Sequence, residues 1–428
     1  MLNKSSYDRI GLPLLTCGLI GVAIFLPWRT FITNMLIIAS AAAWVLYIKK
    51  NREYFREARF FILLLTSVYI VEVLGMIHTD NISYGLHRLE SKLSLIAFPL
   101  IILSSGIKRI HVDRILTAFI ASTVAASLYL TYCAAAKLVS NGQPLSDFIT
   151  NPEYSNVALT EPLQRIHPTF LTLFICLAIF VTTNYVRVNH KRYWLLGVNV
   201  FLLLFAVQLA SRAGYAALVC TLVFIGFGLI GWKRKWLLIF YSALIIAVLA
   251  ASVFFLPSVK SRLVDTVVEA DINKEQMNSV TYHFRAWTCS VESWLNDHIL
   301  FGHGTGDEVD TITKCYHEKQ WLGYGHDAHN EFLSSLVKHG LVGLVTLLVS
   351  FFYPFFLAFK YRDLRYFAFL TIVLISFLAE SMLRGKTGLV FFTLFNSLFL
   401  KDMLIENSVI KSAGQVVPYN TTTVSPGS

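Results

Sequence analysis

Residues 193–231 read YWLLGVNVFLLLFAVQLASRAGYAALVCTLVFIGFGLIG, which is two apolar runs joined by the dipeptide Ser211-Arg212. Each run has close to the ~20 residues that a helix needs to cross the hydrocarbon core of a bilayer. Backbone N–H and C=O groups find no water there, so they must pair within their own segment, as they do in a helix. The stretch therefore predicts two membrane helices connected by a very short turn.

The rest of the chain repeats this pattern. Of its 428 residues, 55% are hydrophobic and 14% are charged, whereas charged residues make up about 25% of an ordinary soluble domain. We predict an all-α, polytopic membrane protein with about twelve transmembrane helices. The spans are expected at roughly 10–28, 31–48, 60–77, 91–107, 114–136, 167–186, 193–210, 213–231, 236–256, 334–358, 365–383 and 387–404.

Basic residues are distributed unevenly between the two sides of these spans. The formal net charge is +10, but the Lys and Arg residues flank apolar runs and no nucleic-acid-binding motif accompanies them, so we expect no nucleic-acid partner. The short loops of one side carry 21 Lys and Arg residues and those of the other side carry six. Because cytoplasmic loops are the more basic ones, both termini are expected in the cytoplasm. This divides the chain into spans one to nine (1–256), an external loop (257–333), spans ten to twelve (334–404) and a polar cytoplasmic tail (405–428).

The external loop is the largest polar segment between spans. Residues 280–300 place apolar side chains close to a period of 3.6, which predicts an amphipathic helix able to lie on the membrane surface. Cys289 and Cys315 share this loop, and they could form a disulfide if it faces an oxidising compartment. The apolar positions are Phe284, Trp287, Val291, Trp294 and Leu295.

A histidine motif follows this loop. His329 and Asn330 begin the pattern His-Asn-x9-Gly-x2-Gly, which ends at Gly340 and Gly343. On one continuous helix, Gly340 would return to within roughly 20° of the direction of His329, and glycines there would let a second helix approach closely. A neutral imidazole accepts a proton near pH 7, so His329 would suit a general base. The alternative is a histidine at a helix start that only binds a neighbouring loop.

Two arginines are expected on the same side as His329. Arg212 lies in a short external turn, where a snorkelling side chain would be the plain explanation, although topological arginines belong on the other side. Arg285 lies on the amphipathic stretch, where a solvated helix face is the alternative. Guanidinium groups bind phosphate oxygens bidentately, so the three residues predict a diphosphate site with a base. Other external cations that could join it are Arg88, Lys92, Arg165, Arg384 and Lys386, and Glu90 and Glu380 could pair with them.

A metal site is the competing interpretation of the loop. Zinc can bind histidine and carboxylate ligands, but the histidines here show no organised spacing and no HExxH pattern. No P-loop or dinucleotide fingerprint occurs either. We therefore expect neither metal nor cofactor. The residues that would have to supply metal ligands are His303, His317, His326, His329, Asp327 and Glu331.

These residues resemble a known family, the bacterial O-antigen ligases. The pattern from His329 to Gly343 is similar to the family signature, and the stretch from Arg285 to Gly304 resembles its outer loop. Ser211-Arg212 resembles its short arginine turn. The resemblance extends to the layout of most of the chain and is specific at about residues 208–216 and 283–345.

The resemblance implies an activity. Such ligases transfer a glycan from undecaprenyl diphosphate to a sugar of lipid A–core, at the periplasmic face of the bacterial inner membrane. Arg212 and Arg285 would bind the diphosphate, with Lys92 or Arg88 as a further basic residue. His329 would activate the acceptor hydroxyl, and direct displacement would invert the anomeric carbon. We expect the nearby arginines to keep the imidazole neutral.

Three other functions remain open. An O-antigen polymerase and a protein O-glycosyltransferase of the same superfamily differ from the ligase only in their acceptor. A transporter or lipid flippase belongs to another class, and Glu72 is the main candidate for a buried mid-span charge. Because the cations gather at one face and no charged relay accompanies Glu72, we favour the ligase.

Overall fold

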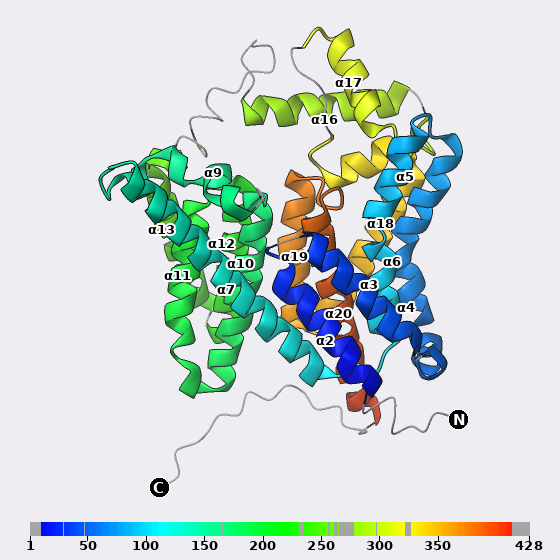
Figure 1. Cartoon of the computed structure of the whole chain (residues 1–428), viewed down its shortest axis with the longest axis horizontal. Coiled ribbons are helices and arrows are strands. Elements are labelled where there is room, and N and C mark those ends of the chain that lie inside the picture. Colours follow the sequence, from blue (N-terminus) through cyan, green and yellow to red (C-terminus); the bar gives the residue numbers. More distant parts are fainter. Residues whose placement is uncertain are drawn as a thin grey trace.

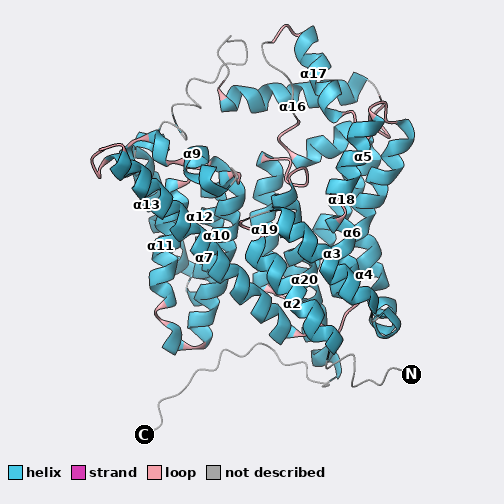
Figure 2. Cartoon of the chain, viewed as in Figure 1, coloured by secondary structure: helices cyan, strands magenta, loops and turns pink. Residues whose placement is uncertain are grey.

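The computed structural model describes residues 10–412 except 29, 47, 164–165, 231–234, 256, 261–263, 265–277, 297 and 322–326. Within this part of the chain the secondary structure is helical and contains no strand (Figure 2). Each of the twelve stretches predicted as spans contains a helix. The all-α, multi-pass membrane architecture is therefore confirmed.

The span count is only partly supported. Six of the helices in the described part are long and apolar enough to cross a membrane, and four further apolar helices are shorter. The stretch predicted at 91–107 forms a helix of 10 residues, α6 (Ser94–Leu103). The six long ones are Asn51–His78, Arg109–Ser140, Pro168–Val188, Arg212–Ile230, Glu331–Lys360 and Lys386–Asn407, and the four shorter ones are Leu12–Phe25, Thr30–Leu46, Leu195–Gln208 and Leu364–Ala379.

The helices form two bundles with a central group between them (Figure 1). One bundle holds α7 (Arg109–Ser140), α10 (Pro168–Val188), α11 (Leu195–Gln208), α12 (Arg212–Ile230) and α13 (Lys235–Phe255). The other holds α4 (Ile48–Leu74), α5 (Ile82–Ser91), α6 and α18 (Glu331–Lys360). Between them lie α2 (Leu12–Phe25), α3 (Thr30–Leu46), α19 (Leu364–Ala379) and α20 (Lys386–Ser412).

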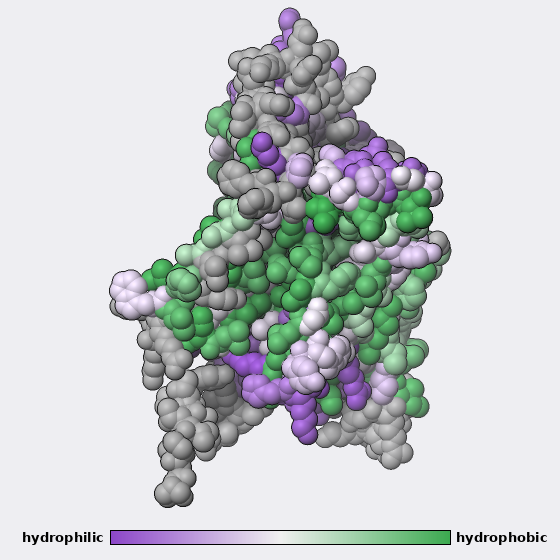
Figure 3. Space-filling model, turned by 90° about the vertical axis from the view of Figure 1, so that its left-hand side faces the viewer, coloured by the Kyte–Doolittle hydropathy of each residue, from purple (hydrophilic) through white to green (hydrophobic). Residues whose placement is uncertain are grey.

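Hydrophobic side chains cover the middle of the visible face in Figure 3, and hydrophilic ones gather above and below it. This is the surface expected of a helical bundle in lipid, where polar groups are costly at mid-depth. Phenylalanines fill much of the interior, for example Phe119, Phe174 and Phe391, whose rings contact one another.

Two helices of the predicted external loop lie across one end of the bundles (Figure 1). They are α16 (Ser279–Asn296) and α17 (Glu308–Glu318), and a disulfide between Cys289 and Cys315 joins them. The cysteine pair left open by the sequence is thus formed. We call this end of the molecule the α16 side.

Helix α18 departs from the sequence prediction. It begins at Glu331, after the N-cap Asn330, so His329 lies before the helix and not on one of its faces. The helix is also broken at Gly340, where φ is 59° and ψ is −151°. The expected alignment of His329 with Gly340 on one helical stripe is therefore wrong.

The break in α18 receives a turn of the loop, residues 299–304. His303 N–H donates to Val337 O at 2.9 Å, and Leu341 N–H donates to Ile299 O at 2.9 Å. A Cβ on Gly340 would lie 2.4 Å from the Leu300 carbonyl carbon. Gly340 thus admits a neighbouring backbone, as predicted for this motif, but the neighbour is the 299–304 segment and not a second helix.

A buried ionic cluster lies beside this break. Lys92 binds the Glu72 carboxylate, and Lys338 Nζ lies 3.2 Å from the same oxygen of Glu72. Lys92 is only 1% exposed. An ammonium held in this way is not available to a diphosphate at the membrane surface, so the assignment of Lys92 to such a site is wrong. Glu72, the candidate for a transport relay, is likewise neutralised by fixed partners.

Candidate functional site

His329 is held in an unusual backbone conformation at the start of α18. Its φ is 44°, a value that few residues other than glycine adopt without cost. The conformation is fixed on both sides, because Asn330 caps the helix by accepting from the N–H groups of Phe332 and Leu333. On the other side, Ala328 N–H donates to Glu308 Oε1 at 3.3 Å. The contacts of Ala328 and Asn330 on either side of His329 thus fix the orientation of the imidazole, which does not lie on a helix face.

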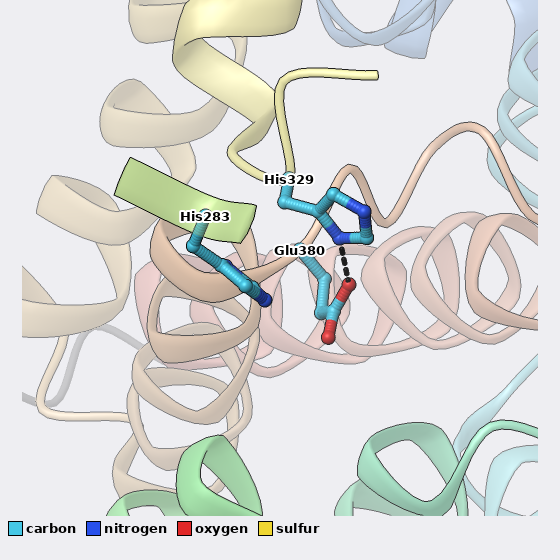
Figure 4. A group of neighbouring side chains, drawn as sticks. All are labelled: His283, His329 and Glu380. Carbon is cyan, nitrogen blue, oxygen red and sulfur yellow. Dashed lines mark hydrogen bonds and ion pairs between the residues drawn. The ribbon is translucent and has the colours of Figure 1, made fainter. Parts of the chain in front are cut away.

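Both ring nitrogens of His329 face carboxylates. Nδ1 lies 3.0 Å from Glu380 Oε2 (Figure 4), and Nε2 lies 3.2 Å from Asp327 Oδ1. Asp327 is itself held by Arg384, whose Nη1 lies 2.8 Å from the same oxygen. Glu380 follows the end of α19, and its other oxygen lies 3.7 Å from His167 Nε2. The imidazole therefore sits between two oriented acids.

These acids set the charge of the imidazole. Burial lowers the pKa of His329, but the hydrogen bond to Glu380 and the charge of Asp327 outweigh it, so the pKa lies above its ordinary value. The pKa of Glu380 is lowered in spite of burial, chiefly by its hydrogen bond to His329. The two carboxylates thus favour the charged form of the imidazole, contrary to the expectation that arginines keep it neutral.

Helix α16 covers the ring of His329. The rings of Tyr282 and His283 lie 5.2 and 4.7 Å from it, and Trp287 Nε1 donates to His329 O at 3.5 Å. Burial lowers the pKa of His283 to about 4, with the charge of His329 as the next cause. His283 is consequently neutral near pH 7.

Of the two predicted arginines, Arg212 acts on this cluster, and Arg285 packs against Trp321. Arg212 begins α12, and its charge helps to lower the pKa of His283, so it acts within the same site. Arg285 lies on α16 two residues after His283; it is 2% exposed, and its guanidinium carbon lies 5.1 Å from the centre of the Trp321 ring. The structure thus brings His329, Arg212 and α16 together at one site.

Arg88 has a different place from the one expected. Its Nη2 donates to Arg384 O at 3.1 Å, and its guanidinium lies 5.9 Å from the Tyr84 ring centre. Arg384 in turn donates to the Tyr84 hydroxyl at 3.4 Å. Arg88 therefore supports the segment that carries Arg384.

Comparison with known proteins bears on this arrangement. Residues 197–348 match the family model described as O-Antigen ligase. The chain carries an O-antigen ligase family domain. No curated protein matches the chain. The matched segment runs from α11 to the first half of α18 and includes Arg212, Arg285 and His329. The family resemblance is thus confirmed, and with it an enzymatic role within the O-antigen ligase/polymerase superfamily.

The sequence does not predict the roles of three site residues, which are His283 and Asp327 within the matched segment and Glu380 outside it. The sequence offers Asp327 only as a metal ligand, and His283 carries no signal, because a histidine on an amphipathic helix is common. Glu380 is expected to pair with a cation of the surface, but it lies 51 positions from His329, beyond any local pattern.

A metal could also be considered at this site. His283, His329 and Glu380 place one ligand atom each within 4.8 Å of one another. Of the metal ligands suggested by the sequence, His329 belongs to this group. His303 does not, since its Nε2 faces Ser293 O at 3.2 Å, and His326 lies outside the described residues. Two guanidinium groups, Arg212 and Arg384, act on the cluster and oppose a divalent cation. That the enzyme needs no metal stays a prediction.

Proposed function

We propose that this protein is an O-antigen ligase, which transfers a glycan from undecaprenyl diphosphate to a sugar of lipid A–core at the periplasmic face of the inner membrane. The observation that carries the proposal is His329, oriented by Glu380 and covered by a helix that bears Arg285. A group-transfer site of this kind needs a base with one nitrogen fixed and the other turned toward a nucleophile. Nδ1 of His329 is the fixed nitrogen.

The reaction starts with the acceptor hydroxyl in the place of Asp327. The hydroxyl displaces Asp327 from Nε2 of a deprotonated His329, and Asp327 keeps its ion pair with Arg384. The hydroxyl oxygen attacks the anomeric carbon, its proton passes to Nε2, and the bond between that carbon and the diphosphate breaks. The electron pair leaves with undecaprenyl diphosphate. A single displacement of this kind inverts the anomeric carbon.

Electrostatics support both ends of this displacement. Charge grows on the diphosphate as its bond to the sugar breaks, and Arg212 and Arg285 would stabilise it from fixed positions. On the other side, the Glu380 carboxylate stabilises the imidazolium that forms when His329 accepts the proton. The donor carries its own leaving group, so the reaction requires neither nucleotide nor metal.

The proposal is tested by transfer with the purified protein in detergent. Undecaprenyl-diphosphate-linked glycan and lipid A–core are combined with EDTA and without nucleotide, and the products are separated by mass. We expect glycan on lipid A–core, and a rate lower by about 10²–10³-fold in Arg212→Gln, as for the loss of one preorganised charge donor. Growth of the glycan on its lipid carrier would instead identify a polymerase, and transfer that stops with EDTA would contradict the metal-free mechanism.

The pH dependence of transfer follows from the acids around His329. Their net effect raises its pKa above the ordinary value, so the base is protonated at low pH and the rate should rise as pH increases through that raised pKa. Glu380→Gln removes the hydrogen-bonded charge that raises the pKa. We expect the acid limb of the kcat profile to move to lower pH and the plateau to fall by about tenfold or more. Glu90→Gln, an exposed carboxylate of α5, is the matched control; an unmoved limb in Glu380→Gln would contradict the assignment.

A further inference from the structure

A cavity of about 290 Å³ opens beside Glu380. It lies where the end of α2, the start of α10 and the start of α20 meet. Its volume is at the lower end of the range for small-molecule sites, about 300–1,000 Å³, which suits one or two sugar rings and excludes a long polymer. The residues that line it include Trp28, His167, Phe170, Gly385 and Lys386.

The cavity exists because the α2–α3 hairpin is short. With 14 residues, α2 rises only about 21 Å, less than the ~30 Å of a hydrocarbon core. In Figure 1 the hairpin consequently ends well below α16.

The walls of the cavity combine aromatic rings with a cation. Trp28 is fixed by the hydrogen bond from its Nε1 to Ser122 Oγ at 2.8 Å, and Phe170 lies against His167 with ring centres 5.6 Å apart. Rigid aromatic rings of this kind bind the apolar C–H face of a pyranose. Lys386 is half-buried, and no carboxylate in the described part of the chain forms an ion pair with it. An ammonium in such a place attracts a phosphate or carboxylate group.

The cavity is connected to the base through one carboxylate. Glu380 Oε1 lies 3.7 Å from His167 Nε2 in the cavity wall, and Glu380 Oε2 lies 3.0 Å from His329 Nδ1. The Arg212 turn contacts a different part of the first turn of α10, where Thr169 Oγ1 lies 2.8 Å from Ser211 Oγ. Ser211, the neighbour of Arg212, and the cavity thus contact the first turn of α10 at different residues.

From this arrangement we propose that the cavity binds the acceptor saccharide of the transfer, a pyranose next to a phosphate or carboxylate group that Lys386 binds. The inference rests on the proposed function. The acceptor is the better occupant because a displacement with inversion brings the nucleophile from the side opposite the leaving diphosphate, and Arg212 is not among the residues that line the cavity. Trp28 and Phe170 then hold the sugar ring, and its hydroxyl extends past Glu380 to Nε2 of His329.

The test measures binding of each substrate without catalysis. Fluorescently labelled lipid A–core is titrated into the full-length protein in nanodiscs with no donor present, and labelled donor is titrated separately. Lys386→Gln removes the cation, and Gly385→Val fills the cavity from a position where a Cβ meets only the Phe170 ring at 3.4 Å. We expect each variant to weaken the Kd for lipid A–core by about tenfold and to leave the Kd for the donor within twofold. Lys137→Gln, an exposed lysine at the end of α7, is the matched control.

Each outcome decides the inference. If lipid A–core does not bind, or binds equally to all variants, the cavity is not the acceptor site. A loss of donor binding in place of acceptor binding would assign the cavity to the donor glycan and overturn the proposal. If both variants lose acceptor binding but the wild-type protein transfers no glycan, the cavity assignment stands and the proposed function fails. Lipid A–core without charged groups should bind to Lys386→Gln and to the wild-type protein with the same Kd. Weaker binding of this ligand to Lys386→Gln would contradict a contact between Lys386 and an anionic group.

Discussion

Replacing His329 by glutamine is expected to lower kcat for glycan transfer by about 10²–10⁴-fold, the usual contribution of a general base. Glutamine keeps a polar side chain between Glu380 and Asp327 but cannot accept the proton of the acceptor hydroxyl. KM for both substrates should change much less, because the arginines and the cavity are untouched. The measurement is steady-state transfer with the purified variant, over a range of each substrate.

The control for this prediction is His87→Gln. His87 is exposed on α5 and outside the site, so its replacement should leave kcat within twofold. A rate for His329→Gln above one tenth of wild type would exclude His329 as the base. In that case Asp327, which lies 3.2 Å from the same imidazole, would be the next residue to replace.

The bilayer explains why the helices could be predicted from the sequence. Every apolar run had to become a helix, because hydrocarbon offers its backbone groups no other partner. The same constraint put the turn with Arg212 and the loop with Arg285 and His329 on one side, so the shared side of these three residues followed from topology. Their side of the membrane was then inferred from the basic residues.

The contacts of these residues could not be predicted, because they join positions far apart in the chain. Glu380 reaches His329 across 51 positions, and Glu72 reaches Lys338 across 266. Lys92 has the sequence context of a surface cation next to an apolar run, although it is buried against Glu72. Charge and spacing alone do not distinguish a cation that binds a ligand from one that neutralises a buried acid.

The break in α18 is hidden in the sequence for a different reason. The helical pattern continues through Gly340 without a proline, so periodicity predicts one continuous helix. Only the approach of residues 299–304 makes the break favourable, since their backbone groups bind those that the helix leaves unpaired. Gly340 thus leaves room for the backbone of the loop. Gly343 leaves room for the His339 side chain, because a Cβ on Gly343 would lie 2.3 Å from it.

Gly340→Ala is expected to destabilise the protein by about 3–5 kcal/mol. A residue with a Cβ is strained at φ 59° and ψ −151°, at a cost of about 1–3 kcal/mol. The added carbon would also meet the Leu300 carbonyl group at 2.4 Å. Segment 299–304 must move away, and each backbone hydrogen bond that it gives up costs about 1 kcal/mol. The apparent Tm in detergent should fall, and transfer activity should fall with it, because this segment follows α16 and is hydrogen-bonded to α18.

Two other glycines separate the causes of that loss. Gly142 has φ 64°, and a Cβ added there would meet no atom within 4 Å, so Gly142→Ala should show backbone strain alone, about 1 kcal/mol. Gly197 lies within α11 with equally open space, and Gly197→Ala should leave the Tm unchanged or raise it. If Gly340→Ala were no more destabilising than Gly142→Ala, the close approach of Leu300 would make no contribution to the free energy of unfolding that Gly340→Ala loses. The loop would then be docked to α18 by its hydrogen bonds alone, and the glycine of the motif would serve only the bend.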